Sequence, residues 1–79
     1  MNYGAVTAPA GDAFAVTPSD TTRLYATALY VGGAGNVVVE TEGGTEVTFN
    51  AVPVGAILPI RCARVLAATT ATNILGLRP

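Results

Sequence analysis

The sequence predicts an all-β fold, a small single-domain sandwich or barrel of about five short strands behind an extended N-terminal arm. From Arg23 onward, β-branched and aromatic residues occur in short runs separated by Gly and Pro, which is typical of an all-β domain. No stretch shows the periodicity of a helix of normal length. With 79 residues there is room for only one domain. We expect the arm to span residues 1–22 and the β-domain to span residues 23–79.

The composition limits how so small a domain can be stabilised. A chain of this length buries only roughly 60 to 65% of its unfolded surface, so it commonly depends on disulfides, a metal or association. Cys62 is the single cysteine and the chain has no His, so an internal disulfide and a structural zinc site are both excluded. Charged residues make up 11% of the chain, against about 25% in ordinary soluble domains. We therefore expect copies of the chain or another protein to cover part of this neutral surface.

The same counts exclude several classes of function. A net charge of −1 gives no basic surface to bind phosphates, which argues against nucleic acid as a partner. No run of about 18 apolar residues exists that could cross a membrane. Cys62 has no His beside it to act as a base, and no other acid-base constellation is visible, so we expect no enzyme activity, no cofactor and no metal. The absence of a visible secretory signal and the lone thiol fit synthesis in a reducing cytoplasm.

Turn residues divide the β-domain into its expected strands. These are Leu24–Val31, Asn36–Thr41, Thr45–Asn50, about Ile57–Leu66, and Asn73–Leu77. We expect residues 32–35, Gly-Gly-Ala-Gly, to form a loop between the first two strands. Pro59 places the start of the fourth strand at a sheet edge or a bulge, because proline has no N–H to donate. The predicted core consists of Leu29, Val31, Val37, Val39, Val47, Phe49, Ile60 and Cys62.

The hairpin between the second and third strands has two competing registers. A two-residue Gly-Gly turn pairs Thr41 with Glu46 and divides the apolar side chains between the two faces. A three-residue loop with Gly44 in the left-handed conformation pairs Thr41 with Thr45 and sets Glu40 opposite Glu46. It also gathers Val37, Val39, Val47 and Phe49 on one face. Burying each of these side chains is worth about 1.5 to 3 kcal/mol, and an opposed pair of like charges costs at most about 1 kcal/mol, so we predict the three-residue loop.

Two arginines stand out in the fourth strand. Arg61 and Arg64 are three residues apart, so their side chains point to opposite faces unless a bulge intervenes, and we expect one of them to be enclosed. Arg61 either lies along the surface with its stem on apolar neighbours or forms an interchain ion pair with Glu40 or Glu46. All four residues are therefore candidate interface residues.

The arm adds four further interface candidates. Its apolar residues Tyr3, Val6, Phe14 and Val16 are too few and too widely spaced to form a core of their own. An extended backbone can satisfy its N–H and C=O groups by adding to the edge of a neighbour's sheet. We therefore expect the arm to contact other chains rather than its own β-domain.

Several short motifs carry a family resemblance through their order and spacing. They are Val16–Thr22 (VTPSDTT), Ala28–Gly35 (ALYVGGAG), Val47–Phe49 (VTF), Val52–Gly55 (VPVG), Leu58–Arg61 (LPIR) and Arg64–Ala67 (RVLA). Between about Phe14 and Leu77 the chain resembles the small head-spike base proteins of tailed phages and gene transfer agents. The resemblance implies a non-enzymatic, oligomeric virion component on the capsid exterior, which joins the shell to a fibre or decorates the shell. Its implied partners are copies of itself, the major capsid protein and a spike or fibre protein.

A different class of function stays open on the residues alone. A carbohydrate-binding β-module, part of a fibre or adhesin that recognises a host glycan, would need exposed aromatic platforms. The available aromatic residues are Tyr3, Phe14, Tyr25, Tyr30 and Phe49. The accessibility of these side chains therefore bears on the choice between the two classes.

Overall fold

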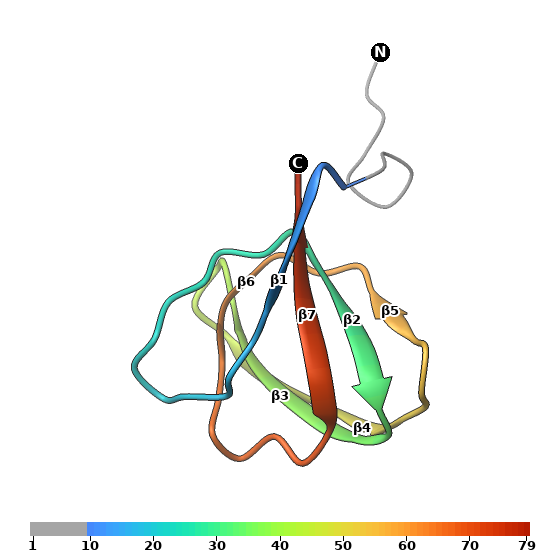
Figure 1. Ribbon diagram of the computed structural model, residues 1–79. Helices are drawn as coiled ribbons and strands as arrows, with labels where there is room; N and C mark the ends of the chain where they lie inside the picture. Colours follow the sequence, from blue (N-terminus) through green and yellow to red (C-terminus); the bar gives the residue numbers. More distant parts are fainter. Residues whose placement is uncertain (1–9) are drawn as a thin grey trace.

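The computed structural model describes residues 10–79 and contains seven β-strands (Figure 1). They are β1 (Asp12–Ala15), β2 (Ala28–Gly33), β3 (Gly35–Thr41), β4 (Glu46–Val52), β5 (Ile57–Leu58), β6 (Cys62–Val65) and β7 (Thr72–Arg78). Residues 10–79 form no helix, and so none that is long and apolar enough to cross a bilayer. The all-β class is therefore confirmed.

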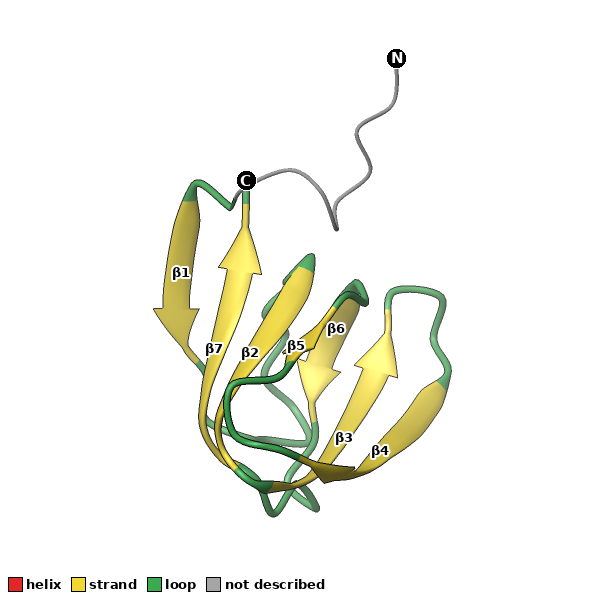
Figure 2. Ribbon diagram, turned by 90° about the vertical axis from the view of Figure 1, so that its right-hand side faces the viewer, coloured by secondary structure: helices red, strands yellow, loops and turns green. Residues whose placement is uncertain are grey.

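The strands form two antiparallel sheets that face each other (Figure 2). One sheet has four strands in the order β1-β7-β2-β5, and the other has three in the order β4-β3-β6. At one end of the molecule β2 runs directly into β3, so a single stretch of chain contributes to both sheets. The predicted sandwich is confirmed, with seven strands in place of about five.

The structure corrects the predicted contacts of the arm. β1 falls within residues 1–22 and pairs with β7 of its own domain, where Phe14 lies opposite Gly76. The space above Gly76 explains this pairing, because a Cβ at that position would collide with the Phe14 ring. The prediction that the arm contacts other chains rather than its own β-domain is therefore wrong for β1. Tyr3 and Val6 lie outside the described residues.

The predicted fourth strand is divided in two by its proline. Pro59 separates β5 from β6, and the two strands belong to different sheets. The N–H of Ile60 donates to the carbonyl of Leu58 at 2.9 Å, which makes a tight turn in place of a continuous strand. A proline in this position removes one ladder donor, so the sheet pairing cannot run through it.

The passage from β2 to β3 occupies a single residue, Ala34, rather than the predicted four-residue loop. Gly33 ends one strand and Gly35 begins the next. A Cβ on Gly35 would lie 2.6 Å from the backbone nitrogen of Ala71, closer than real Cβ contacts come. Glycine at position 35 therefore allows the chain to turn from one sheet to the other while it passes close to the segment before β7.

The predicted hairpin register is confirmed. Val39 pairs with Val47, Val37 with Phe49, and Glu40 with Glu46. The N–H of Thr41 donates to the carbonyl of Thr45 at 2.8 Å, and Gly44 has a φ of 92°, in the region that favours glycine. Burial of apolar side chains on one face therefore outweighs the like-charge pair, as the energies indicated.

The core lies between the two sheets. Five of the eight predicted core residues are buried, namely Leu29, Val31, Val37, Val39 and Cys62. Val47, Phe49 and Ile60 are half-buried; Val47 and Phe49 pack against this core from β4, an edge strand. The other buried apolar residues are Ala26, Val52, Ala63, Val65, Leu66, Ala71 and Ile74. The apolar side chains of the predicted hairpin face thus lie in or against the interior.

We predict that Gly35→Ala destabilises the fold by about 1 to 3 kcal/mol, the usual cost of forcing extra volume into a packed site. The added methyl group would meet backbone atoms of Thr70 and Ala71, which can move only with their whole segment. Thermal or denaturant unfolding measures the change. Gly43→Ala is the matched control, because its Cβ would meet only the Thr41 hydroxyl at 3.8 Å. Equal stability of the two variants would contradict this account of Gly35.

Candidate assembly surfaces

The four-stranded sheet turns two rows of side chains away from the core. Strand register aligns Ala15, Leu75, Tyr30 and Ile57 across β1, β7, β2 and β5, in that order. A second row, two residues along each strand, consists of Ala13, Leu77 and Ala28. Because residues two apart in a strand share a face, both rows lie on the outer side of the sheet. We call these seven residues the apolar face.

The apolar face combines exposed and half-buried side chains. Ile57 is 58% exposed and Leu75 is 36% exposed, while Tyr30 and Leu77 are half-buried among their neighbours. Sequence reasoning missed this surface, because strand order is needed to assemble it. The sequence indicates a second covered face only indirectly. In β2 and β7, apolar residues occupy successive positions, whereas a strand with one solvent-facing side has them at alternate positions. Such runs are typical of strands covered on both faces.

The outer face of the three-stranded sheet has the opposite character. Its exposed and half-buried side chains include Glu40 from β3, Glu46, Thr48 and Asn50 from β4, and Arg64 from β6. We call this surface the polar face. The two outer faces of the sandwich therefore differ in chemistry, one apolar and the other polar and ionic.

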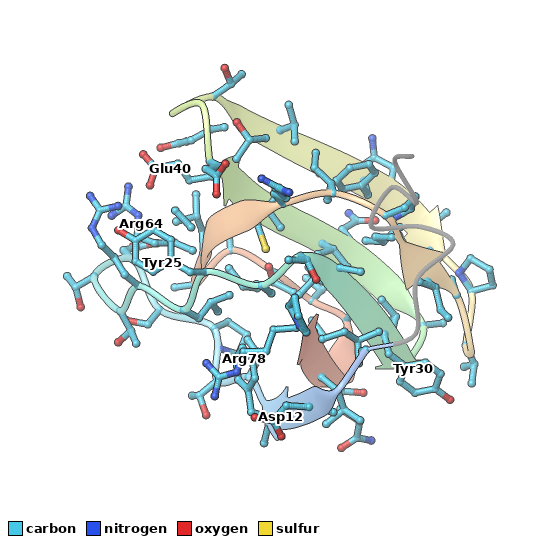
Figure 3. All side chains as sticks on the ribbon, turned by 90° about the horizontal axis from the view of Figure 1, so that it is seen from above. Asp12, Tyr25, Tyr30, Glu40, Arg64 and Arg78 are labelled. Carbon is cyan, nitrogen blue, oxygen red and sulfur yellow. The ribbon has the colours of Figure 1, made fainter. Side chains whose placement is uncertain are left out.

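An ion pair joins two strands on the polar face. The Arg64 Nε donates to Glu40 Oε1 at 2.7 Å, and Arg23 approaches the same oxygen at 3.9 Å. Another guanidinium N–H of Arg64 donates to the backbone carbonyl of Asp20. Figure 3 shows Glu40, Arg64 and Tyr25 together on one side of the molecule, with Tyr30 at the opposite side. The pair thus holds the segment before β2 against the three-stranded sheet.

The Arg64 hydrogen bond lowers the pKa of Glu40 from its ordinary value of 4.5. The charges of Arg64 and Arg23 act in the same direction, against the partial desolvation of the carboxylate. This arrangement explains how the hairpin tolerates Glu40 opposite Glu46, since Arg64 offsets the repulsion between them.

The two arginines of the predicted strand differ in the way that was expected. The Arg64 side chain is 22% exposed and the Arg61 side chain is 62% exposed, so one of the two is enclosed. Arg64 binds Glu40 of its own chain, and Arg61 lies 3.6 Å from Glu42, also within the chain. Contacts of these two arginines, Glu40 and Glu46 with another chain stay a prediction.

The remaining candidates, Phe14 and Val16, lie at the edge of the four-stranded sheet. Both are half-buried and pack against the core. The guanidinium of Arg78 lies 4.5 Å from the centre of the Phe14 ring and 3.3 Å from Asp12. Residues 10–79 therefore cover the core-facing side of β1 only in part.

Tyr25 is a further surface feature that sequence reasoning did not single out as a site. Its side chain is 57% exposed, and its φ of 51° is unusual for a residue other than glycine. The strand bridge between Ala26 and Cys62 fixes the next residue, which holds Tyr25 outward. Within residues 10–79 no group of three His, Cys, Asp or Glu side chains is placed to hold a metal ion.

Comparison with solved structures finds a full-length relative. The chain matches a component of the capsid of a native gene transfer agent particle, computed with C5 symmetry, at 40% identity and a TM-score of 0.79. The match covers 99% of this chain and 100% of the other. The chain belongs to the capsid-associated proteins of phage-like gene transfer agents. No family model and no curated protein matches the sequence.

Membership of this family fits the low reactivity of the single cysteine in the structure. Its relative is a structural component of a particle, so a structural role in a virion follows at the level of the family. Burial raises the pKa of the Cys62 thiol to about 11, which makes this cysteine a poor nucleophile.

We predict that Glu40→Gln lowers the stability of the chain at neutral pH and reduces its loss of stability in acid. A carboxylate whose pKa is lowered on folding stabilises the folded state at pH values above its ordinary pKa of 4.5. This contribution is lost as the pH falls through the lowered pKa.

Denaturant unfolding at several pH values measures the effect of Glu40→Gln. Glu42→Gln is the control, because its 3.6 Å pair with Arg61 is solvent-exposed and should contribute little. Parallel stability profiles for Glu40→Gln and the unmodified chain would contradict the assignment.

Proposed function

We propose that the chain is a non-enzymatic structural protein on the capsid exterior, an oligomeric head-spike base or decoration component that binds the shell. The observation that carries the proposal is the match at 40% identity over the whole length to a capsid component of a gene transfer agent particle. The match does not distinguish a head-spike base from other capsid components. The order of motifs between Phe14 and Leu77 supports the head-spike assignment.

The apolar face supports attachment to a protein surface. It extends across all four strands of one sheet, and its residues Ile57, on the edge strand β5, and Leu75, on the inner strand β7, are exposed. Contiguous apolar surface of this kind is uncommon on monomeric soluble proteins and is typical of protein interfaces. We infer that this face contacts the major capsid protein.

We further infer a cyclic oligomer. The capsid that contains the relative was computed with C5 symmetry, and chains around such an axis are equivalent. The fixed stoichiometry of a ring also suits a base on which a spike or fibre protein stands. The molecular mass of the chain in solution and on particles, measured by light scattering, distinguishes a pentamer from a trimer or a dimer.

We predict that Ile57→Glu abolishes co-sedimentation of the purified chain with spike-free particles. A charge buried at an apolar interface without a partner costs several kcal/mol, which weakens binding on the order of a hundredfold or more. Ile57 is 58% exposed in the isolated chain, so the substitution should leave the fold intact. Circular dichroism and thermal unfolding check that assumption.

Ala68→Glu is the matched control, since it adds the same charge at the exposed turn between β6 and β7, outside the seven residues of the apolar face. The control should sediment with particles like the unmodified chain. Equal sedimentation of both variants would remove the apolar face from the shell contact. Specific binding on a glycan array, with no binding to particles, would replace the proposed function by the carbohydrate-binding one.

A further inference from the structure

Two of the four edge strands are blocked within the described residues. β5 has only two residues and is followed directly by Pro59, which cannot donate to a ladder. The outer edge of β6 is covered by the segment before β2, where the N–H of Leu24 donates to the carbonyl of Ala63 at 2.8 Å. Among residues 10–79, nothing pairs with the outer edges of β1 in one sheet and β4 in the other, and we call these the open edges.

β4 is the longer of the two open edges. In an antiparallel pair, every second residue directs its N–H and C=O toward the partner strand. The hydrogen bond from Thr41 to Thr45 fixes this alternation and directs the backbones of Val47 and Phe49 toward β3. The N–H and C=O groups of Glu46, Thr48 and Asn50 therefore point away from the domain. No proline interrupts the strand, so the edge can accept another strand.

β1 offers the second open edge. The N–H of Val16 donates to the carbonyl of Ile74 at 2.9 Å, which directs the backbone of Phe14 toward β7. The backbones of Ala13 and Ala15 therefore point outward. Their side chains are small and exposed, so a second strand can approach without steric hindrance.

The core-facing side chains at both open edges are incompletely covered. Phe14 of β1 and Val16, the residue that follows β1, are half-buried, and so are Val47 and Phe49 of β4. Beside β1 the surface is hollowed by an open groove, whose mixed lining joins the apolar Phe14, Val16 and Leu24 to polar residues that include Arg23 and Arg78. This groove gives apolar side chains of an adjoining strand a place to pack.

We propose that the open edges of two copies of the chain pair with each other. β4 of one copy lies antiparallel to β1 of its neighbour. Ala15 would lie opposite Thr48, and Ala13 opposite Asn50. The same register sets Phe14 beside Phe49 and Val16 beside Val47 on the core-facing side, because paired residues in an antiparallel ladder share a face. Every pair is uncharged, and the four half-buried side chains become covered together.

This contact is heterologous, since it joins two different edges of identical chains. Where the rotation from one copy to the next closes, such a contact forms a ring and leaves neither edge open, whereas a rotation that does not close gives a filament. The inference therefore rests on the proposed cyclic oligomer and supplies its interface. A two-fold contact of β4 with itself would instead give a closed dimer and leave every β1 edge unpaired.

Disulfide trapping of the full-length chain tests the register. Residues directly opposite in a hydrogen-bonded pair have Cα atoms about 5.5 Å apart, within the range that a disulfide spans. The double variant Ala15→Cys/Thr48→Cys, treated with diamide alone and on particles, should give a ladder of multiples on non-reducing gels. Cys62 is buried and should not react.

Three controls make the outcome decisive. Ala15→Cys alone and Thr48→Cys alone should give no ladder, because neither residue meets its own copy. Ala15→Cys/Ala68→Cys should also give none, since Ala68 lies on the exposed turn between β6 and β7 and belongs to neither edge strand. Efficient dimers from Thr48→Cys alone would establish the two-fold contact and overturn the proposal. A double variant that binds particles without cross-linking would also overturn it, while the proposed function would stand.

A proline gives an independent test. Thr48→Pro removes an N–H that points away from β3, so the domain should remain folded while the oligomer dissociates to monomers. Thr48→Val keeps the N–H and should preserve the oligomer. Analytical ultracentrifugation compares the two, with circular dichroism as the check on folding. A folded Thr48→Pro chain that retains the oligomeric mass would exclude β4 from the interface.

Discussion

The structure depends on one nearly continuous extended run, from Ala28 to Thr41, that passes from the first sheet to the second. Leu29 and Val31 lie on one side of the passage at Ala34, and Val37 and Val39 on the other, all fully buried. Because the same stretch supplies inner strands of both layers, the sandwich closes without a long connection. The tight approach of Gly35 to Ala71 sets where that passage occurs, and the remaining strands pair outward from it.

The register of the hairpin between β3 and β4 can be predicted from the residues of the hairpin alone. Its register follows from comparing the burial of four apolar side chains with one like-charge pair, and both quantities can be read from neighbouring residues. The enclosure of one of Arg61 and Arg64 follows from strand alternation in the same way. By contrast, nothing in the local sequence pattern brings β1 to β7, since that pairing depends on the space above Gly76, which is distant in the chain. Pro59 signalled an interruption, but only the three-dimensional arrangement shows that the two halves enter different sheets.

The candidate surfaces also divide into those that local sequence indicates and those that depend on the order of the strands. Glu40, Arg64, Phe14 and Val16 attract attention in the sequence by charge or by position, and the structure gives each of them contacts within the chain's own domain. The apolar face escaped prediction because its residues come from four strands whose order is not the order of the chain. A small domain with few charges still separates its two outer faces by chemistry, with an ionic cluster on one side and apolar side chains on the other.

The central position of β7 has a consequence for how the domain folds. β7 is the last strand of the chain, yet it lies between β1 and β2, so neither of these strands has this partner until residues 72–78 have been made. Pairings between residues so distant in sequence form slowly, because the loop between them must close first. The four-stranded sheet is therefore completed only after β7 has been synthesised, and until then its apolar strands stay exposed to one another and to other copies. Strand edges and apolar surface that stay unpaired in this way make the unfinished domain prone to aggregate.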